Sequence, residues 1–218
     1  MEERQVVVDA VRSVSVSVHG DGDTAVLLGH GAGGTRKTPF LLRVAESIVA
    51  TGRRAALFNF PYTESGRRLP DPPALLEATV ARVAESIRGL GAKRLVLGGK
   101  SMGGRIASQA VAQGLAADAL LFLGYPLHPP GRTDKLRDKH LPNVAAPMLF
   151  VQGTRDEFAR WDLLEATLAR LGDRATLLRI EDGDHSFLVR KKVTGKTTTE
   201  VERGLLAGVM TWLEDRGL

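Results

Sequence analysis

Short segments that are almost wholly apolar recur along the chain between polar stretches. Strands covered on both faces by other elements have this composition, because neither face meets water. The segments are 24–30, 54–60, 94–99, 117–125, 147–153 and 175–181. Ahead of them lie two further β-rich runs, 5–11 and 14–20, and the second alternates Val with Ser or His as a half-exposed strand does. The pattern predicts a sheet of buried parallel strands preceded by two strands of a different kind.

Helical periodicity fills the intervals between the apolar segments. The predicted helices are 40–50, 73–87, 102–113, 160–171 and 200–213. Alternation of strand and helix predicts an α/β fold with a mostly parallel, doubly wound sheet and helices on both of its faces. The first two strands lack a helix between them, so we expect them to form an antiparallel edge. Since no linker or repeat interrupts the pattern, we expect one domain over residues 1–218, with ligands bound beyond the carboxyl ends of the strands.

Composition narrows the classes of function. The chain has no cysteine, which excludes disulfides, thiolate metal ligands and a cysteine nucleophile. The first 13 residues are charged and contain no apolar signal-peptide core, and no apolar run approaches the ~20 residues that cross a bilayer. We therefore expect a cytoplasmic protein without a membrane partner. The net charge is +5, but the basic residues are dispersed and aromatics make up only 5%, so we expect no nucleic-acid partner.

The segment 94–99 runs into the sequence Gly-Lys-Ser-Met-Gly at 99–103, and a predicted helix follows. The pattern G-x-S-x-G between a strand and a helix is typical of a nucleophile elbow, a sharp turn that presents a serine at the edge of the sheet. Small neighbours are needed because strand and helix approach closely at the turn. This context predicts Ser101 as a nucleophile.

A serine hydroxyl needs a base to take its proton and an acid to orient that base. Asp156 follows the strand 147–153, and His185 follows the strand 175–181, in the chain order serine, acid, histidine. His185 is predicted as the base and Asp156 as the acid. The acids near these two positions that could replace Asp156 are Glu157, Asp182 and Asp184.

The first buried strand ends in a glycine-rich stretch, His-Gly-Ala-Gly-Gly at 30–34. Backbone N–H groups in such a loop can stabilise an oxyanion, together with the amide that follows the nucleophile. We predict the amides of Met102 and Ala32 as these two donors, and we expect His30 to brace the loop or to border the substrate.

The same stretch also imitates a phosphate-binding loop. Residues 31–38 nearly fit the pattern G-x-x-x-x-G-K-[ST], and 98–101 imitate the end of that motif. Arg36 replaces the second glycine in the first copy, and Arg94 replaces the first glycine in the other. Neither neighbouring strand ends in the aspartate that Mg²⁺ would require. A nucleotide site is therefore not predicted.

The chain contains the elements HGAGG, FNFPYTESGRRLPDPP, GGKSMGGRIAS, LGYPLHPPG, FVQGTRD and GDHSF. Through these elements it resembles the KANL/Tex-type branch of the α/β-hydrolases, which is similar to the dienelactone hydrolases, and the resemblance runs from about residue 24 to the C-terminus. The resemblance implies the α/β-hydrolase fold, the triad Ser101, Asp156 and His185, and an oxyanion loop at 30–34. It names no substrate, and some relatives in the branch are thought to be subunits of chromatin complexes.

Three cations near the predicted site have open roles. Arg67 or Arg68 could bind an acidic substrate, or pair with Glu64 to shape the pocket, or form a surface ion pair of little energetic weight. Lys100 could attract an anion or point into solvent. The interval between Tyr125 and the strand that starts at 147 spans only about twenty residues, so we expect little or no lid.

These observations predict a serine hydrolase that cleaves a small ester or thioester through an acyl-enzyme on Ser101. The expected partner is a polar small-molecule substrate, with an anionic substrate as one option, and we expect no metal or organic cofactor. The alternative is a binding or scaffold protein that keeps the fold but has weak catalysis. The sequence predicts no oligomeric state.

Overall fold

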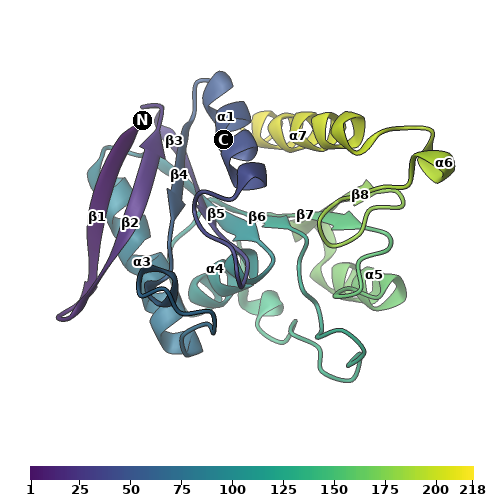
Figure 1. The fold of residues 1–218 in the computed structure, drawn as a ribbon, viewed down its shortest axis with the longest axis horizontal. Helices are drawn as coiled ribbons and strands as arrows, with labels where there is room; N and C mark the ends of the chain where they lie inside the picture. The colour runs from purple at the N-terminus through teal and green to yellow at the C-terminus, as the bar shows by residue number, and fades with distance from the viewer.

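The computed structural model describes residues 1–218 and places all of its strands in one eight-stranded sheet (Figure 1). The order across the sheet is β1-β2-β4-β3-β5-β6-β7-β8. The strands are β1 Glu2–Asp9, β2 Arg12–His19, β3 Thr24–Gly29, β4 Arg54–Phe58, β5 Arg94–Lys100, β6 Ala119–Leu123, β7 Met148–Gly153 and β8 Ala175–Ile180. From β4 to β8 all neighbours are parallel, which confirms the predicted mostly parallel sheet.

Helices cover both faces of the sheet. In Figure 1, α1 and α7 lie above it, and α3, α4 and α5 lie below it. Each face has its own apolar core, of 34 buried residues on one side and 22 on the other, so the central strands are buried on both sides as their composition predicts. The longer helices are α1 Pro39–Ala50, α3 Pro73–Gly89, α4 Met102–Ala112, α5 Trp161–Leu171 and α7 Thr198–Glu214.

The N-terminal strands form the predicted antiparallel edge. β1 pairs antiparallel with β2, and β2 pairs antiparallel with β4. Val14, Val16 and Val18 point into the core, as the alternation in this segment predicts. Ser17, on the other face, is buried as well, so the end of β2 is covered on both sides.

The sequence prediction missed several short elements and one helix start. The short helices α2 Pro61–Glu64 and α6 Lys191–Thr194 and the 3-10 turns Leu141–Asn143 and Gly172–Arg174 are too brief to show a period. Helix α7 begins at Thr198, ahead of the predicted start at 200. Thr197 and Glu200 form a capping box, in which each side chain accepts a hydrogen bond from the other's backbone N–H, so the first turn is stabilised before the apolar period begins.

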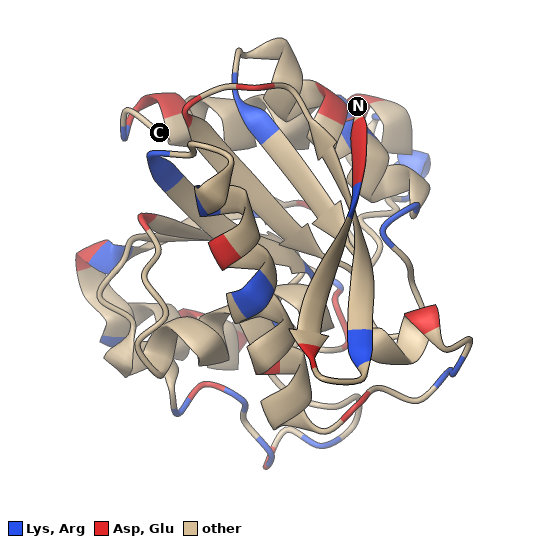
Figure 2. Ribbon diagram, turned by 90° about the vertical axis from the view of Figure 1, so that its left-hand side faces the viewer, with Lys and Arg blue, Asp and Glu red and all other residues tan.

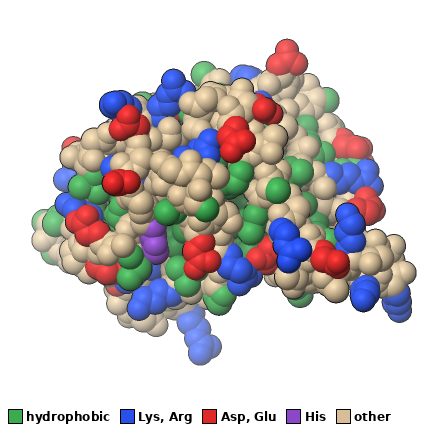
Figure 3. Space-filling view, turned by 90° about the horizontal axis from the view of Figure 1, so that it is seen from above, with side chains coloured by type: hydrophobic (Ala, Val, Ile, Leu, Met, Phe, Trp, Pro, Cys, Tyr) green, Lys and Arg blue, Asp and Glu red, His purple; other side chains and the backbone are tan.

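The connection between β6 and β7 contains one 3-10 turn and no helical lid. None of its residues lines the cavity beside Ser101. No helix combines the length and apolar character that crossing a membrane demands. Acidic and basic residues are interspersed along the ribbon in Figure 2, and the face shown in Figure 3 has no large patch of side chains of one sign.

Candidate functional site

Ser101 occupies a sharp turn between β5 and α4. Its backbone has φ 50° and ψ −114°, a conformation that costs free energy for a residue with a side chain. The turn is possible because Gly99 adopts φ 144°, and because a Cβ on Gly103 would collide with the backbone of Gly29 in β3. The predicted elbow geometry is present, and it depends on these glycines.

The structure brings Ser101, His185 and Asp156 into one chain of hydrogen bonds. The Ser101 Oγ lies 2.9 Å from the His185 Nε2, and the His185 Nδ1 lies 2.7 Å from the Asp156 Oδ2. Because a carboxylate only accepts, the Nδ1 carries the proton and the Nε2 is free to accept from the serine. β5 positions Ser101, the turn after β7 positions Asp156, and the loop after β8 positions His185.

The three other acids near this chain are engaged elsewhere or lie apart from it. Asp182 forms ion pairs with Arg190 and Arg155, and the Arg190 guanidinium lowers its pKa to about 2. The Asp184 carboxylate accepts hydrogen bonds from backbone N–H groups of its own loop. Glu157 is exposed. Only Asp156 contacts the histidine.

Two residues that the sequence prediction missed hold Asp156 and His185. The Gln152 Nε2 donates to the Asp156 Oδ2 at 2.6 Å, while its Oε1 accepts from the Tyr125 N–H at 2.8 Å. The Phe158 N–H donates to the Asp156 Oδ1 at 2.8 Å, and its ring packs 4.3 Å from the imidazole. Gln152 is fully buried in an otherwise apolar strand, and that isolated polar residue is the signal that could have identified it.

The glycine-rich loop after β3 turns beside the serine. The Gly34 N–H donates to the Gly31 carbonyl at 2.9 Å, and Gly33 has φ 87°, so Ala32 stands at the tip of a tight turn and lines the cavity. A Cβ built on Gly31 would lie 3.6 Å from the Ser101 Cβ. Met102 is the first residue of α4, so its amide has no carbonyl partner within that helix.

His30 lies beneath this loop and does not line the cavity. Its Nδ1 donates to the Gly31 carbonyl at 2.8 Å, and its Nε2 accepts from the Phe60 N–H at 3.2 Å. Burial lowers its pKa, which keeps the ring neutral. These contacts brace the loop, as predicted, and leave His30 no contact with a substrate.

The expectations for Arg67 and Arg68 need correction. Arg67 pairs with Asp71 at 2.6 Å, which fits the surface ion pair among the three alternatives. The alternative of a pair with Glu64 is wrong for Arg67, and the Glu64 carboxylate accepts from the Ser15 N–H at 2.7 Å. Both arginines are exposed, and neither lines the cavity beside Ser101. The hydrogen bond between Glu64 and Ser15 holds the α2 turn against β2.

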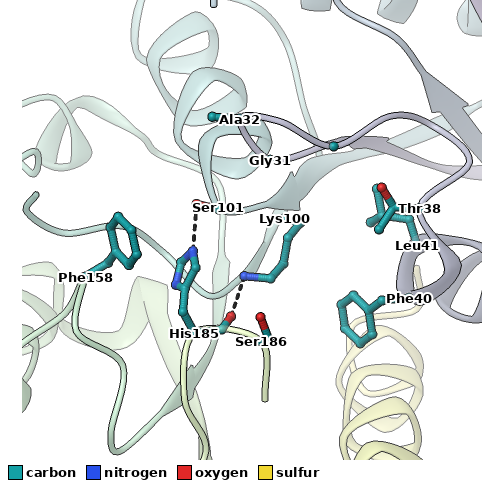
Figure 4. Close-up of a pocket in the computed structure, with 11 residues that line it drawn as sticks. Gly31, Ala32, Thr38, Phe40, Leu41, Lys100, Ser101, Phe158, His185 and Ser186 are labelled. Atoms are coloured by element: carbon teal, nitrogen blue, oxygen red, sulfur yellow. Dashed lines mark hydrogen bonds between the residues drawn. The ribbon is translucent and has the colours of Figure 1, made fainter. Parts of the chain in front are cut away.

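A cavity of about 390 Å³ opens beside Ser101 (Figure 4). Lys100 lines it and does not point into solvent: its Nζ donates to the His185 backbone carbonyl at 2.6 Å, and burial lowers its pKa to about 8. The lining residues are Gly31, Ala32, Gly34, Thr38, Phe40, Leu41, Lys100, Ser101, Phe158, His185 and Ser186.

Solved structures of the same fold cover nearly the whole chain. A serine hydrolase without a lid from Xanthomonas campestris matches with a TM-score of 0.75 and 22% identity over 97% of this chain and 94% of the other. A dienelactone hydrolase from Anabaena variabilis gives 0.71 and 22% over 96% and 97%. A cold-adapted esterase from an Arctic intertidal metagenomic library gives 0.68 and 20% over 99% and 92%.

A family model described as an alpha/beta hydrolase domain matches residues 22–214, most of the chain. The match includes β3 through α7, and thus Ser101, Asp156 and His185. The finer placement in the KANL/Tex-type branch stays a prediction. The fold, its strand order and this match together establish that the chain belongs to the α/β-hydrolase family.

Proposed function

We propose that the protein is a serine hydrolase that cleaves small esters or thioesters through an acyl-enzyme on Ser101. Membership of the α/β-hydrolase family supports hydrolysis in general. The observation that carries the proposal is the continuous chain from the Ser101 Oγ through His185 to Asp156, at 2.9 Å and 2.7 Å, beside an open cavity. An ordinary surface serine has neither a base within reach nor a strained backbone.

In the proposed reaction, the His185 Nε2 takes the proton of Ser101 as its Oγ attacks the ester carbonyl. The amides of Met102 and Ala32 donate to the resulting oxyanion. His185 then protonates the leaving alcohol or thiol, and an acyl-enzyme remains on the serine. A water deprotonated by His185 attacks this acyl group, and the serine regains its proton. Throughout, Asp156 stabilises the imidazolium and holds the tautomer.

The cavity supports a small substrate. Its volume of about 390 Å³ lies near the lower end of the range for small-molecule sites, roughly 300–1,000 Å³. Phe40, Leu41 and Phe158 provide apolar wall, and no lid extends it over a long acyl chain. We therefore propose carboxylesterase-like activity on short esters.

A fluorophosphonate probe tests the nucleophile directly. The wild type and Ser186→Ala, which removes the other serine in the cavity, are expected to label, whereas Ser101→Ala is expected not to. Turnover of 4-nitrophenyl acetate should fall at least 10³-fold in Ser101→Ala and His185→Ala. A properly folded wild type that neither labels nor turns over esters would refute the proposal and favour the alternative, a binding or scaffold protein.

A further inference from the structure

The ammonium of Lys100 is surrounded by groups that accommodate a cation. Its side chain passes over Gly124, where a Cβ would lie only 2.8 Å from the Lys100 Nζ, so any larger residue would displace the ammonium. The Phe187 ring lies 5.3 Å from the Nζ, within the range of a cation–π contact. One N–H is held by the His185 carbonyl at 2.6 Å. The position of the ammonium is therefore fixed from three sides.

This ammonium has no carboxylate partner. Asp156 and Asp184 are the acids whose charges reach it, but the first is bonded to Gln152, His185 and Phe158, and the second to backbone N–H groups. Neither forms an ion pair with Lys100, whereas Asp182, which precedes the same loop, pairs with both Arg155 and Arg190. An ammonium offers three N–H donors, and two of these find no acceptor in the protein.

Lys100 is partly buried, and a partly buried ammonium without a counter-ion gains free energy when an anion joins it. Lys100 lines the same cavity as Ser101, and none of the residues lining that cavity is acidic. Figure 4 shows Lys100 next to Ser101, with Phe158 on one side of the cavity and Phe40 and Leu41 on the other. A ligand that fills the cavity can thus contact the serine and the ammonium at once.

We propose that Lys100 determines specificity by binding a free carboxylate of the substrate, so that the enzyme prefers esters that carry a second, unesterified acid group. The proposal rests on the proposed serine hydrolysis. The ester carbonyl lies at Ser101, a short apolar linker passes Phe40 and Leu41, and the carboxylate accepts the two remaining N–H groups of Lys100. No step of the reaction is transferred to the lysine.

Matched substrate pairs test this preference. The first pair is 4-nitrophenyl hydrogen adipate and its primary amide, with the acid in the acyl part. The second is 4-acetoxybenzoate and 4-acetoxybenzamide, with the acid in the leaving group. In each pair the two members are nearly equal in size and differ in charge. The readout is the ratio of kcat/KM for the acid to that for the amide.

For at least one pair, we expect the wild-type ratio to exceed 10 and to fall about 10- to 100-fold in Lys100→Met, the scale of a hydrogen bond to a charged group. Lys93→Met, which removes an exposed lysine just before the start of β5, at the opposite end of that strand from Lys100, should keep the wild-type ratio. Ratios near 1 in the wild type, or a ratio unchanged in Lys100→Met, would overturn the proposal. The wild-type ratios decide alone if Lys100→Met does not fold.

The two proposals fail in different ways. Hydrolysis of the ester bond in the two neutral substrates, which carry a primary amide in place of the acid, reports on Ser101 and does not require a carboxylate. The same holds for labelling by the fluorophosphonate probe. If the wild type cleaves the ester of the neutral substrates but shows no preference for the acidic ones, the proposed function stands and the proposed role of Lys100 is refuted. If the wild type cleaves neither substrate of a pair and is not labelled by the probe, both proposals are refuted.

Discussion

The unpaired ammonium of Lys100 should weaken the fold, and replacing it by methionine should strengthen the fold at neutral pH. Burial lowers the pKa of Lys100 from its ordinary 10.5 to about 8, which corresponds to about 3 kcal/mol of destabilisation when the group is charged. Lys100→Met removes that penalty but also removes the hydrogen bond to the His185 carbonyl, worth about 1 kcal/mol. The expected net gain in the free energy of unfolding is about 2 kcal/mol at pH 7.

The pH dependence has a definite sign. Below pH 8 the lysine is protonated in both states, so the folded wild type carries the full penalty. Between pH 8 and 10.5 the folded state has lost its proton while the unfolded chain still binds it, so the stability of the wild type rises with pH relative to the variant. At pH 10 the remaining penalty is about 1 kcal/mol, and the advantage of Lys100→Met should vanish.

Urea unfolding followed by the fluorescence of Trp161 and Trp212 measures this difference at pH 7 and pH 10. The difference between variant and wild type isolates Lys100, because the other titrating groups are common to both proteins. A Lys100→Met protein that is less stable than the wild type at pH 7 would refute the reasoning. So would an advantage of the same size at both pH values, which would indicate better packing and not the loss of a buried charge.

Three further changes probe the supports of the site. Gln152→Leu should lower kcat for 4-nitrophenyl acetate about tenfold and the free energy of unfolding by about 2 kcal/mol, because Asp156 loses a buried donor. Gly103→Ala should abolish fluorophosphonate labelling through its collision with β3, whereas Gly204→Ala, in an open stretch of α7, should raise stability by up to about 1 kcal/mol in the same unfolding assay. Asp182→Asn should lower the thermal midpoint at pH 7, and the deficit should shrink between pH 4 and pH 2, as the wild-type carboxylate gains its proton.

Each of these three expectations has a result that contradicts it. Unchanged kcat in Gln152→Leu would mean that Asp156 is held well enough without the amide. Normal labelling in Gly103→Ala would show that β3 and α4 can separate without moving the serine. A pH-independent deficit in Asp182→Asn would attribute the loss to packing, since asparagine tolerates the positive φ of this position.

The sequence predicted most of the fold because its signals are local and repeated. The apolar segments locate the strands, and the chain order of serine, acid and histidine fixed which strand ends had to meet. The sequence favoured Asp156 by its chain order but left Glu157, Asp182 and Asp184 as possible replacements, since all four follow a strand and only the turn geometry decides which one faces His185. The sequence did not show the direction of the loop after β4, so it left open whether Arg67 binds a substrate, pairs with Glu64 or forms a surface ion pair. Its partner is Asp71.

Lys100 shows a different limit. Both alternatives considered for it treated the side chain as free, either attracting an anion or pointing into solvent. The structure gives it a fixed contact with the His185 carbonyl, across 85 positions of sequence, and that contact depends on the glycine at 124. A contact between a side chain and a backbone atom far away in the sequence leaves no periodic pattern of residues, so the sequence alone does not predict it.

The short connection between β6 and β7 has a consequence for the timing of catalysis. Since the connection between β6 and β7 does not cover the cavity, we expect a substrate to reach Ser101 without waiting for a lid to move, and the product to leave by the same path. The rate of hydrolysis should then depend on the chemical steps and on diffusion of the substrate. It should rise smoothly with the concentration of dissolved ester and show no abrupt increase at the concentration where the ester aggregates. The water that completes each cycle enters by the same mouth, so the acyl group on the serine stays exposed to solvent for its whole lifetime.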